Sequence, residues 1–178
     1  VKKDDGSCLQ IRGAFDIGSG ATKLKVARVD RCHNTFTPND ILFTKEDRVP
    51  FKEDLQESKD KRFSEKVIAQ GIQTLKSLAA EAKKTANVVI FVGVATQAFR
   101  EAANANEFIE RAKTEANVKV SVIDQQMEGQ LGFEGAALAT GFPRDRLIAW
   151  DIGGGSMQIT SINRDGAWQM HKSELASV

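Results

Sequence analysis

A glycine-rich turn that occurs twice is the feature that most constrains the fold of this chain. It reads Asp-Ile-Gly-Ser-Gly at residues 16–20 and Asp-Ile-Gly-Gly-Gly-Ser at residues 151–156. Each copy follows an apolar run and precedes a segment of alternating apolar and polar residues, which is the pattern of a β-hairpin. Glycine can adopt a positive φ, and it lets backbone N–H groups approach an anion without a Cβ in the way. A single copy is equally well explained as a structural turn, but two copies at matching junctions predict a site that holds a phosphate chain from both sides.

The sequence around the turns excludes two common phosphate-binding motifs. No Gly-x-x-x-x-Gly-Lys-Ser/Thr stretch occurs, so the chain has no P-loop. A dinucleotide-binding fingerprint requires a helix after its glycine turn, whereas a strand is expected after each turn here. The predicted anion site therefore belongs to a different class of fold.

The hydrophobic pattern between and around these turns predicts alternating strands and helices. Apolar residues recur at helical spacing after Ser64, a suitable N-cap, whereas the charged segment 50–62 has no regular pattern and is interpreted as a loop. The run at residues 88–94 is continuous and rich in β-branched residues, which is typical of a buried parallel strand. The expected strands are 13–17, 22–29, 41–43, 88–94, 118–123, 147–150, 157–162 and 167–171, and the expected helices are 64–82, 104–116 and 126–140.

This order, β-β-β-α-β-α-β-α followed by a further hairpin, predicts an α/β fold of the actin-like (ribonuclease H-like) type, in which helices flank a mixed sheet. We expect a polar tail at residues 1–10 and a first actin-like domain at residues 11–145. Residues 146–178 are expected to be the beginning of a second such domain that is truncated.

Charge and cysteine content limit the classes of partner and the cellular compartment that we expect for this chain. The net charge is +1 and no apolar run is long enough to span a bilayer, so we expect neither a nucleic acid polymer nor a membrane as a partner. A polyanionic ligand would have to be attracted by a local site. Cys8 and Cys32 are isolated cysteines in a mixed α/β chain, which favours free thiols over a disulfide. We expect a cytoplasmic protein, with a periplasmic location left open.

Two further segments resemble a known family. Residues 94–108, Val-Ala-Thr-Gln-Ala-Phe-Arg-Glu-Ala-Ala-Asn-Ala-Asn-Glu-Phe, are similar to the Ala-Thr-x-Ala-x-Arg-x-Ala-x-Asn-x-x-x-Phe signature of the exopolyphosphatase / guanosine pentaphosphate phosphohydrolase (Ppx/GppA) family, in the actin-like ATPase superfamily. Residues 122–133 resemble that family's Val-Ile-Ser-Gly-x-Glu-Glu-Ala-Arg-Leu segment, and residues 151–156 its second phosphate loop. The resemblance covers about residues 13–163 and keeps the family's order and spacing.

The resemblance implies a role for each matching residue. Glu128 falls where the family has a catalytic glutamate that acts as base on the attacking water. Arg100 falls on an arginine of the active-site cleft, which can pair with phosphate oxygens in a bidentate manner. Asp16 and Asp151 are the expected carboxylates on the Mg²⁺ side, since Mg²⁺ prefers oxygen ligands. The expected phosphate-binding residues are Gly18, Ser19 and Gly20 in the first loop and Gly153, Gly154, Gly155 and Ser156 in the second.

The chain also departs from the family pattern. Ser19-Gly20 stands where the family usually has Ser-Asn, Met127 replaces the first of two glutamates, and Gln130 replaces an arginine. The family's C-terminal glycine segment has no counterpart here, and many members form homodimers through that C-terminal part. These differences bear on substrate preference, turnover and oligomeric state.

Several of these residues have ordinary alternative explanations. Arg100 can cap a helix or pair with a nearby carboxylate, and Glu128 can be an exposed helix carboxylate. Lys23 and Lys25 flank the first turn, where a solvated strand face explains them better than phosphate attraction does.

The resemblance implies a Mg²⁺-dependent phosphohydrolase that cleaves terminal phosphoanhydride bonds, with water activated by Glu128. The expected enzyme is an exopolyphosphatase or a guanosine-5′-triphosphate,3′-diphosphate pyrophosphatase, acting on inorganic polyphosphate or guanosine pentaphosphate. The sequence does not choose between these substrates. The alternatives are an actin-like, kinase-like ATP-binding protein and a catalytically weak regulator that binds polyphosphate or nucleotide.

Overall fold

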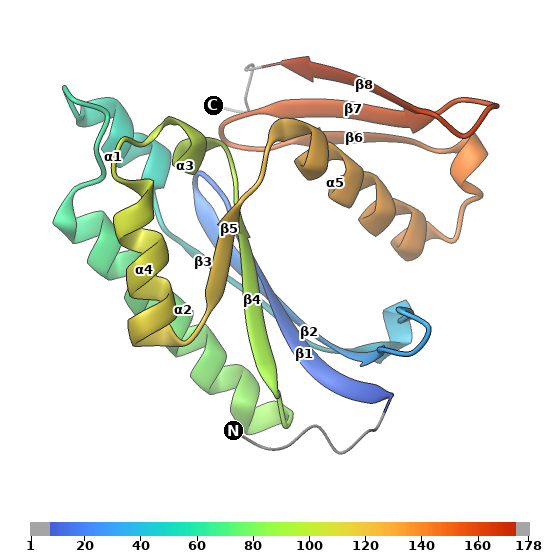
Figure 1. Ribbon diagram of the computed structural model, residues 1–178, viewed down its shortest axis with the longest axis horizontal. Helices are drawn as coiled ribbons and strands as arrows, with labels where there is room; N and C mark the ends of the chain where they lie inside the picture. The colour runs from blue at the N-terminus through green and yellow to red at the C-terminus, as the bar shows by residue number, and fades with distance from the viewer. Residues whose placement is uncertain (1–7, 174–178) are drawn as a thin grey trace.

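Two separate β-sheets organise the computed structural model, which describes residues 8–173 (Figure 1). The first sheet has five strands in the order β3-β2-β1-β4-β5. An antiparallel meander of three strands is extended by two parallel ones, as expected for an actin-like half-domain. The strands are β1 (Leu9–Ile17), β2 (Ala21–Asp30), β3 (Ile41–Arg48), β4 (Ile90–Ala95) and β5 (Lys119–Val122).

The second sheet is a smaller antiparallel meander in the order β6-β7-β8. The long helix α5 (Gln125–Thr140) packs against it, and a 3₁₀ turn, η2 (Arg144–Arg146), leads from that helix into the sheet. The three strands are β6 (Ile148–Ile152), β7 (Met157–Ile162) and β8 (Trp168–Ser173).

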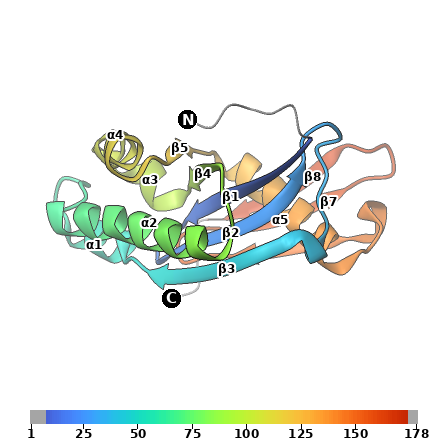
Figure 2. The ribbon, with the colours of Figure 1, turned by 90° about the horizontal axis from the view of Figure 1, so that it is seen from below.

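The remaining helices cover one face of the five-stranded sheet and form the main core with it. Figure 2 shows these helices on one side of that sheet, and α5 with the second sheet on the other. They are α1 (Phe51–Glu57), α2 (Glu65–Thr85), α3 (Gln97–Glu101) and α4 (Ala105–Ala116), and a 3₁₀ turn, η1 (Pro38–Asp40), precedes β3. Four phenylalanine rings meet at the centre of this helical layer, with centroids 4.7–5.4 Å apart: Phe51, Phe63, Phe99 and Phe108.

Local sequence signals explain the longest of these helices. The Ser64 side chain accepts a hydrogen bond from the Val67 N–H at 3.2 Å, which is the predicted N-cap. Buried residues then recur at helical spacing to Ala82, so α2 presents one apolar face to the sheet. None of the helices among residues 8–173 is long and apolar enough to cross a bilayer.

The structure corrects two details of the strand and helix predictions. The segment 50–62 was expected to be a loop, but it contains α1, in which Phe51 and Leu55 lie four residues apart and are both buried. One turn of helix is enough to bury this pair, and the charged residues around it conceal the pattern. The strand expected at 88–94 is parallel as predicted but is buried on one face only, because Ile90 and Val92 are 44% and 43% exposed.

The expectation of free thiols is wrong, because Cys8 and Cys32 form a disulfide. The register of the β1–β2 pair places Leu9 opposite Asp30, so the residues just beyond each strand meet at the open end of the hairpin. The two Cα atoms lie 5.3 Å apart, within the range that a disulfide spans without strain. Spacing along the chain does not reveal this contact because it depends on the strand register.

Candidate functional site

The two glycine turns lie side by side and line one cavity. We call residues 18–20, between β1 and β2, loop 1, and residues 153–156, between β6 and β7, loop 2. A Cβ added to Gly155 would lie less than 3.0 Å from Ser19 Oγ, so the backbone of loop 2 packs directly against loop 1. Both loops line a cavity of about 270 Å³ together with Asp16, Thr96, Glu128 and Asp151 and others.

An equivalent backbone hydrogen bond closes each of the two loops. The Gly18 N–H donates to the Ala21 carbonyl at 2.9 Å, and the Gly153 N–H donates to the Ser156 carbonyl at 2.9 Å. No glycine of either loop has a positive φ, so conformational freedom is not why glycine stands there. Space is the reason at Gly155, which neighbouring side chains approach closely. Glycine thus serves close approach here, one of the two reasons expected from the sequence.

Glu128 projects from the first turn of α5 into the cavity, where it lies beside loop 2. Asp124 caps this helix by accepting a hydrogen bond from the Met127 N–H at 2.7 Å, which fixes where the helix begins. One Glu128 oxygen, Oε2, accepts from Arg100 at 2.9 Å, and the other, Oε1, lies 3.4 Å from the Ser156 hydroxyl. The Glu128 side chain is only 15% exposed, so it is not an ordinary surface carboxylate.

The electrostatic surroundings of Glu128 favour its protonated form. Burial raises the pKa of Glu128 above the usual carboxyl value, and the negative charges of Asp151 and Asp16 add to that rise. The hydrogen bond and charge of Arg100 act in the opposite direction. A carboxylate with a raised pKa is a better proton acceptor once it is ionised, which suits a general base.

Arg100 lies in the last turn of α3, and its side chain reaches two other parts of the fold. Its Nη1 donates to the Ile123 carbonyl at 2.9 Å as well as to Glu128. Ile123 follows β5 and Glu128 opens α5, so Arg100 ties the strand end to the helix that carries the carboxylate. The residue therefore reaches the cavity through Glu128.

Two further carboxylates, Asp16 and Asp151, stand at the ends of β1 and β6 and line the same cavity. Burial raises the pKa of Asp16, the nearby Lys23 lowers it, and the like charge of Asp151 raises it. Lys23 Nζ lies 4.0 Å from Asp16 Oδ2. The negative charges of these two carboxylates repel each other, and a divalent cation, which prefers oxygen ligands, would relieve that repulsion.

These carboxylates fit Mg²⁺ held with part of its water shell. Mg²⁺ is usually bound by one or two carboxylates together with substrate phosphates and water. Among the described residues, the potential ligand atoms that cluster within 4.8 Å are those of Cys8, Asp30 and Cys32, which include the disulfide.

Three residues of the site were not assigned a role from the sequence. Thr96 lines the cavity, and the buried Gln97 beside it accepts a hydrogen bond from the Ser19 hydroxyl at 3.4 Å. The Lys23 side chain is 54% exposed, as expected for a solvated strand face, and it also lines the cavity wall. The position of Thr96 and Gln97 directly after a parallel strand is a usable signal, because ligands of α/β folds bind at the carboxyl ends of the strands.

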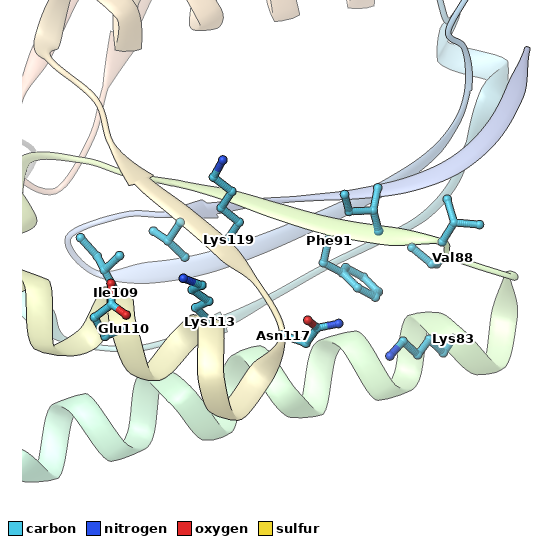
Figure 3. Close-up of a pocket in the computed structure, with 11 residues that line it drawn as sticks. Lys83, Val88, Phe91, Ile109, Glu110, Lys113, Asn117 and Lys119 are labelled. Atoms are coloured by element: carbon cyan, nitrogen blue, oxygen red, sulfur yellow. The ribbon is translucent and has the colours of Figure 1, made fainter. Parts of the chain in front are cut away.

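A second cavity, of about 480 Å³, lies at the opposite ends of β4 and β5 (Figure 3). Its lining includes Phe91 and the lysines Lys83, Lys113 and Lys119, and none of the residues expected to bind phosphate. It opens at the amino ends of the two parallel strands, where ligand sites of this class of fold are not found. The cavity between the loops is therefore the candidate site.

Comparison with known proteins identifies the family of the chain. Residues 26–175 match the Ppx/GppA phosphatase family. A curated relative, the bifunctional 3-dehydroquinate synthase/phosphatase of Fusobacterium nucleatum, is 27% identical over 175 residues, which cover 94% of this chain and 25% of that protein.

Solved structures show the same fold. The crystal structure of the Aquifex aeolicus Ppx/GppA family member is 25% identical, with a TM-score of 0.75 over 94% of this chain and 52% of that one. The exopolyphosphatase from Cytophaga hutchinsonii is 24% identical, with a TM-score of 0.76 over 94% of this chain and 51% of that one. The chain thus spans about half the length of these solved relatives, and the actin-like fold expected from the sequence is confirmed.

Proposed function

The chain belongs to the Ppx/GppA phosphatase family, and on that premise we propose that it carries the phosphate-binding part of a hydrolase that cleaves terminal phosphoanhydride bonds. The proposed substrates are inorganic polyphosphate and guanosine pentaphosphate. One observation carries the proposal: two loops of the same sequence type line one cavity, and a partly buried carboxylate, Glu128, lines it as well and lies 3.4 Å from Ser156 of loop 2. The Aquifex aeolicus and Cytophaga hutchinsonii relatives support it.

In this proposal the backbone of the loops binds the terminal phosphates. Consecutive N–H groups of loop 1 and loop 2 would donate to phosphate oxygens from opposite sides. Asp16 and Asp151 would hold Mg²⁺, which when bound neutralises charge on the phosphate oxygens. Lys23, on the same wall, would add a positive charge where a polyanion enters.

Glu128 would act as the base on the attacking water. Arg100 holds Oε2 of Glu128, which leaves Oε1 directed toward loop 2 and available to accept a proton from water in line with the terminal phosphate. The positive charge of Arg100 also offsets the charge that develops on the transferred phosphoryl group. Arg100 is therefore proposed to position the base and to stabilise the transition state.

We further propose that residues 146–178 begin a second actin-like domain. The meander β6-β7-β8 repeats the arrangement of β1-β2-β3, with a glycine loop between the first and second strand in both. The remainder of that domain would complete the second wall of the cleft. The full-length protein is accordingly the right material for any activity assay.

The Cys8–Cys32 disulfide gives an argument about the cellular compartment of the protein. Disulfides persist mainly in oxidising compartments and are rare in the cytosol of mesophiles. The Cys8–Cys32 bond therefore favours the periplasmic alternative over the cytoplasmic location expected from the sequence. Fractionation of cells that express the full-length protein would distinguish the two.

The test of the proposed function is release of phosphate by the full-length protein, with Mg²⁺, from long-chain polyphosphate and from guanosine pentaphosphate. Glu128→Gln keeps the size of the side chain but removes the base, so we expect the rate to fall by about 10²–10⁴-fold. Glu134→Gln is the matched control, because Glu134 lies on the same helix and pairs with the exposed Arg144.

Two results would contradict the proposal. The first is a Glu128→Gln rate that equals the wild-type rate. The second is a wild-type protein that releases no phosphate: tight ATP binding would then favour the kinase-like alternative, and binding of polyphosphate would favour the regulator.

A further inference from the structure

A buried amide–hydroxyl pair lies beneath the point where the two loops meet. Gln97 is 8% exposed and Ser19 is 5% exposed, and the Ser19 hydroxyl lies 3.4 Å from Gln97 Oε1. Gln97 opens α3, directly after β4, whereas Ser19 belongs to loop 1. The pair therefore fixes loop 1 to the end of a core strand of the five-stranded sheet.

The orientation of the Gln97 amide is set from the other side. Its Nε2 donates to Glu101 Oε1, an acceptor-only carboxylate. Because the amide nitrogen is committed to Glu101, the amide oxygen must face the loops. The Gln97 oxygen is thus presented to loop 1 and loop 2 in a fixed direction.

Loop 2 contacts the same pair of atoms through a glycine. A Cβ added to Gly155 would lie less than 3.0 Å from both Gln97 Oε1 and Ser19 Oγ. Gly155 does not have a positive φ, so an alanine would be excluded by these two side chains rather than by the backbone. The loop 2 backbone therefore rests directly on the Gln97–Ser19 pair.

We infer that Gln97 is a positioning residue that sets the distance between loop 1 and loop 2, and through it the grip on a phosphate chain. The inference rests on the proposed function of the loops. Within residues 8–173 the Gln97 side chain hydrogen-bonds to Ser19 and Glu101 and not to Glu128 or Arg100, so its loss should weaken phosphate binding more than proton transfer. Gln97→Ala leaves Ser19 without its acceptor and removes the support under Gly155. We expect KM to rise about tenfold with a much smaller change in kcat.

The discriminating experiment is a double-mutant cycle on the full-length protein, with affinity for inorganic polyphosphate measured by calorimetry beside KM and kcat. Gly155→Ala alone should weaken binding by at least about tenfold, since a Cβ must displace buried atoms. Combined with Gln97→Ala, the same substitution should bind more tightly than Gly155→Ala alone, because deleting the Gln97 side chain removes one of the two close contacts of the methyl group and leaves only the contact with Ser19 Oγ.

A second variant separates the steric support that the Gln97 side chain gives to loop 2 from its hydrogen bond to Ser19. Gln97→Met keeps most of the side-chain length but lacks the amide, so it should bind polyphosphate more tightly than Gln97→Ala does. Thermal melting of each variant shows whether the fold is retained, and Gln97→Met serves as the reference where Gln97→Ala melts early.

The outcomes separate this inference from the proposed function. If the wild type binds and hydrolyses polyphosphate but Gly155→Ala is as harmful with Gln97→Ala as without it, the inference fails and the proposed function stands. If kcat falls as much as KM rises in Gln97→Ala, the residue acts on the chemical step and the inference also fails. A wild-type protein that binds no polyphosphate would contradict both the inference and the proposed function.

Discussion

Loop 1 and loop 2 share their sequence type and their internal hydrogen bond, but they are supported differently. Loop 1 is braced by the segment that follows β3: the Lys52 N–H donates to the Ser19 carbonyl at 2.9 Å, and the Val49 N–H donates to the Gly20 carbonyl at 3.1 Å. Val49 and Phe51 are fully buried there. Loop 1 is therefore continuous with the main core.

Loop 2 is carried by a sheet with much less cover. On β6, Ile148 and Trp150 are 70% and 65% exposed, although large apolar side chains usually pack in a core. Loop 2 is tied to the site by side chains instead, through Ser156, which accepts from Gln158 at 3.0 Å and lies 3.4 Å from Glu128. Loop 1 is thus anchored in the main core, whereas loop 2 is carried by the second sheet and contacts α5.

The largest expected effect comes from breaking the support of loop 1. Phe51→Ala deletes a fully buried ring that touches three other phenylalanines, and we expect it to lower the free energy of unfolding by about 3–5 kcal/mol. Trp150→Ala is the counterpart under loop 2, and its effect should stay within about 0.5 kcal/mol because the side chain is mostly exposed. Chemical denaturation of both variants measures the difference. Equal losses would contradict the unequal support.

An intermediate effect is expected from the disulfide at the far end of the loop 1 hairpin. Cys8 and Cys32 are 24 residues apart, and opening a loop of that size should cost roughly 3 kcal/mol of stability. Melting with and without dithiothreitol measures it, and the Cys8→Ser/Cys32→Ser double variant, which has no bond to reduce, is the control. Polyphosphate affinity should not change on reduction, because the bond lies at the opposite end of the strands from loop 1. A loss of affinity would show that the hairpin transmits strain to the loop.

The smallest effect is expected at Asp16, the carboxylate near the end of β1, just before loop 1. Its pKa is raised by burial, so its contribution to stability is fully present below the unfolded-state pKa and is lost as the pH rises through the folded-state pKa. Asp16→Asn should therefore be slightly more stable than the wild type at pH 7 and equal to it at pH 3. The difference should stay below about 1 kcal/mol, since the side chain is 51% exposed and solvent screens it. Asp165→Asn, in an exposed turn, is the control, and a less stable Asp16→Asn variant at pH 7 would overturn the assignment.

The contrast between the loops and the segments that support them also explains which features could be predicted from the sequence. The glycine turns, the succession of strands along the chain and the cap at Ser64 are local signals, and the structure confirms them because neighbours along the chain determine them. Helix α1 was missed because two buried apolar residues stand among charged ones. The roles of Gln97 and the Cys8–Cys32 bond depend on strand register and on packing between distant segments, which no local pattern encodes. The support of the loops was thus harder to predict than the loops themselves.

The central claim is that both loops hold one phosphate chain. Backbone amide chemical shifts of the full-length protein, recorded by NMR during titration with a short polyphosphate and Mg²⁺ in the Glu128→Gln background, test it most directly. We predict that the amides of residues 18–20 and of residues 153–156 shift together and give a single dissociation constant. Shifts in only one loop, or shifts confined to the cavity near Lys83 and Lys113, would contradict the account.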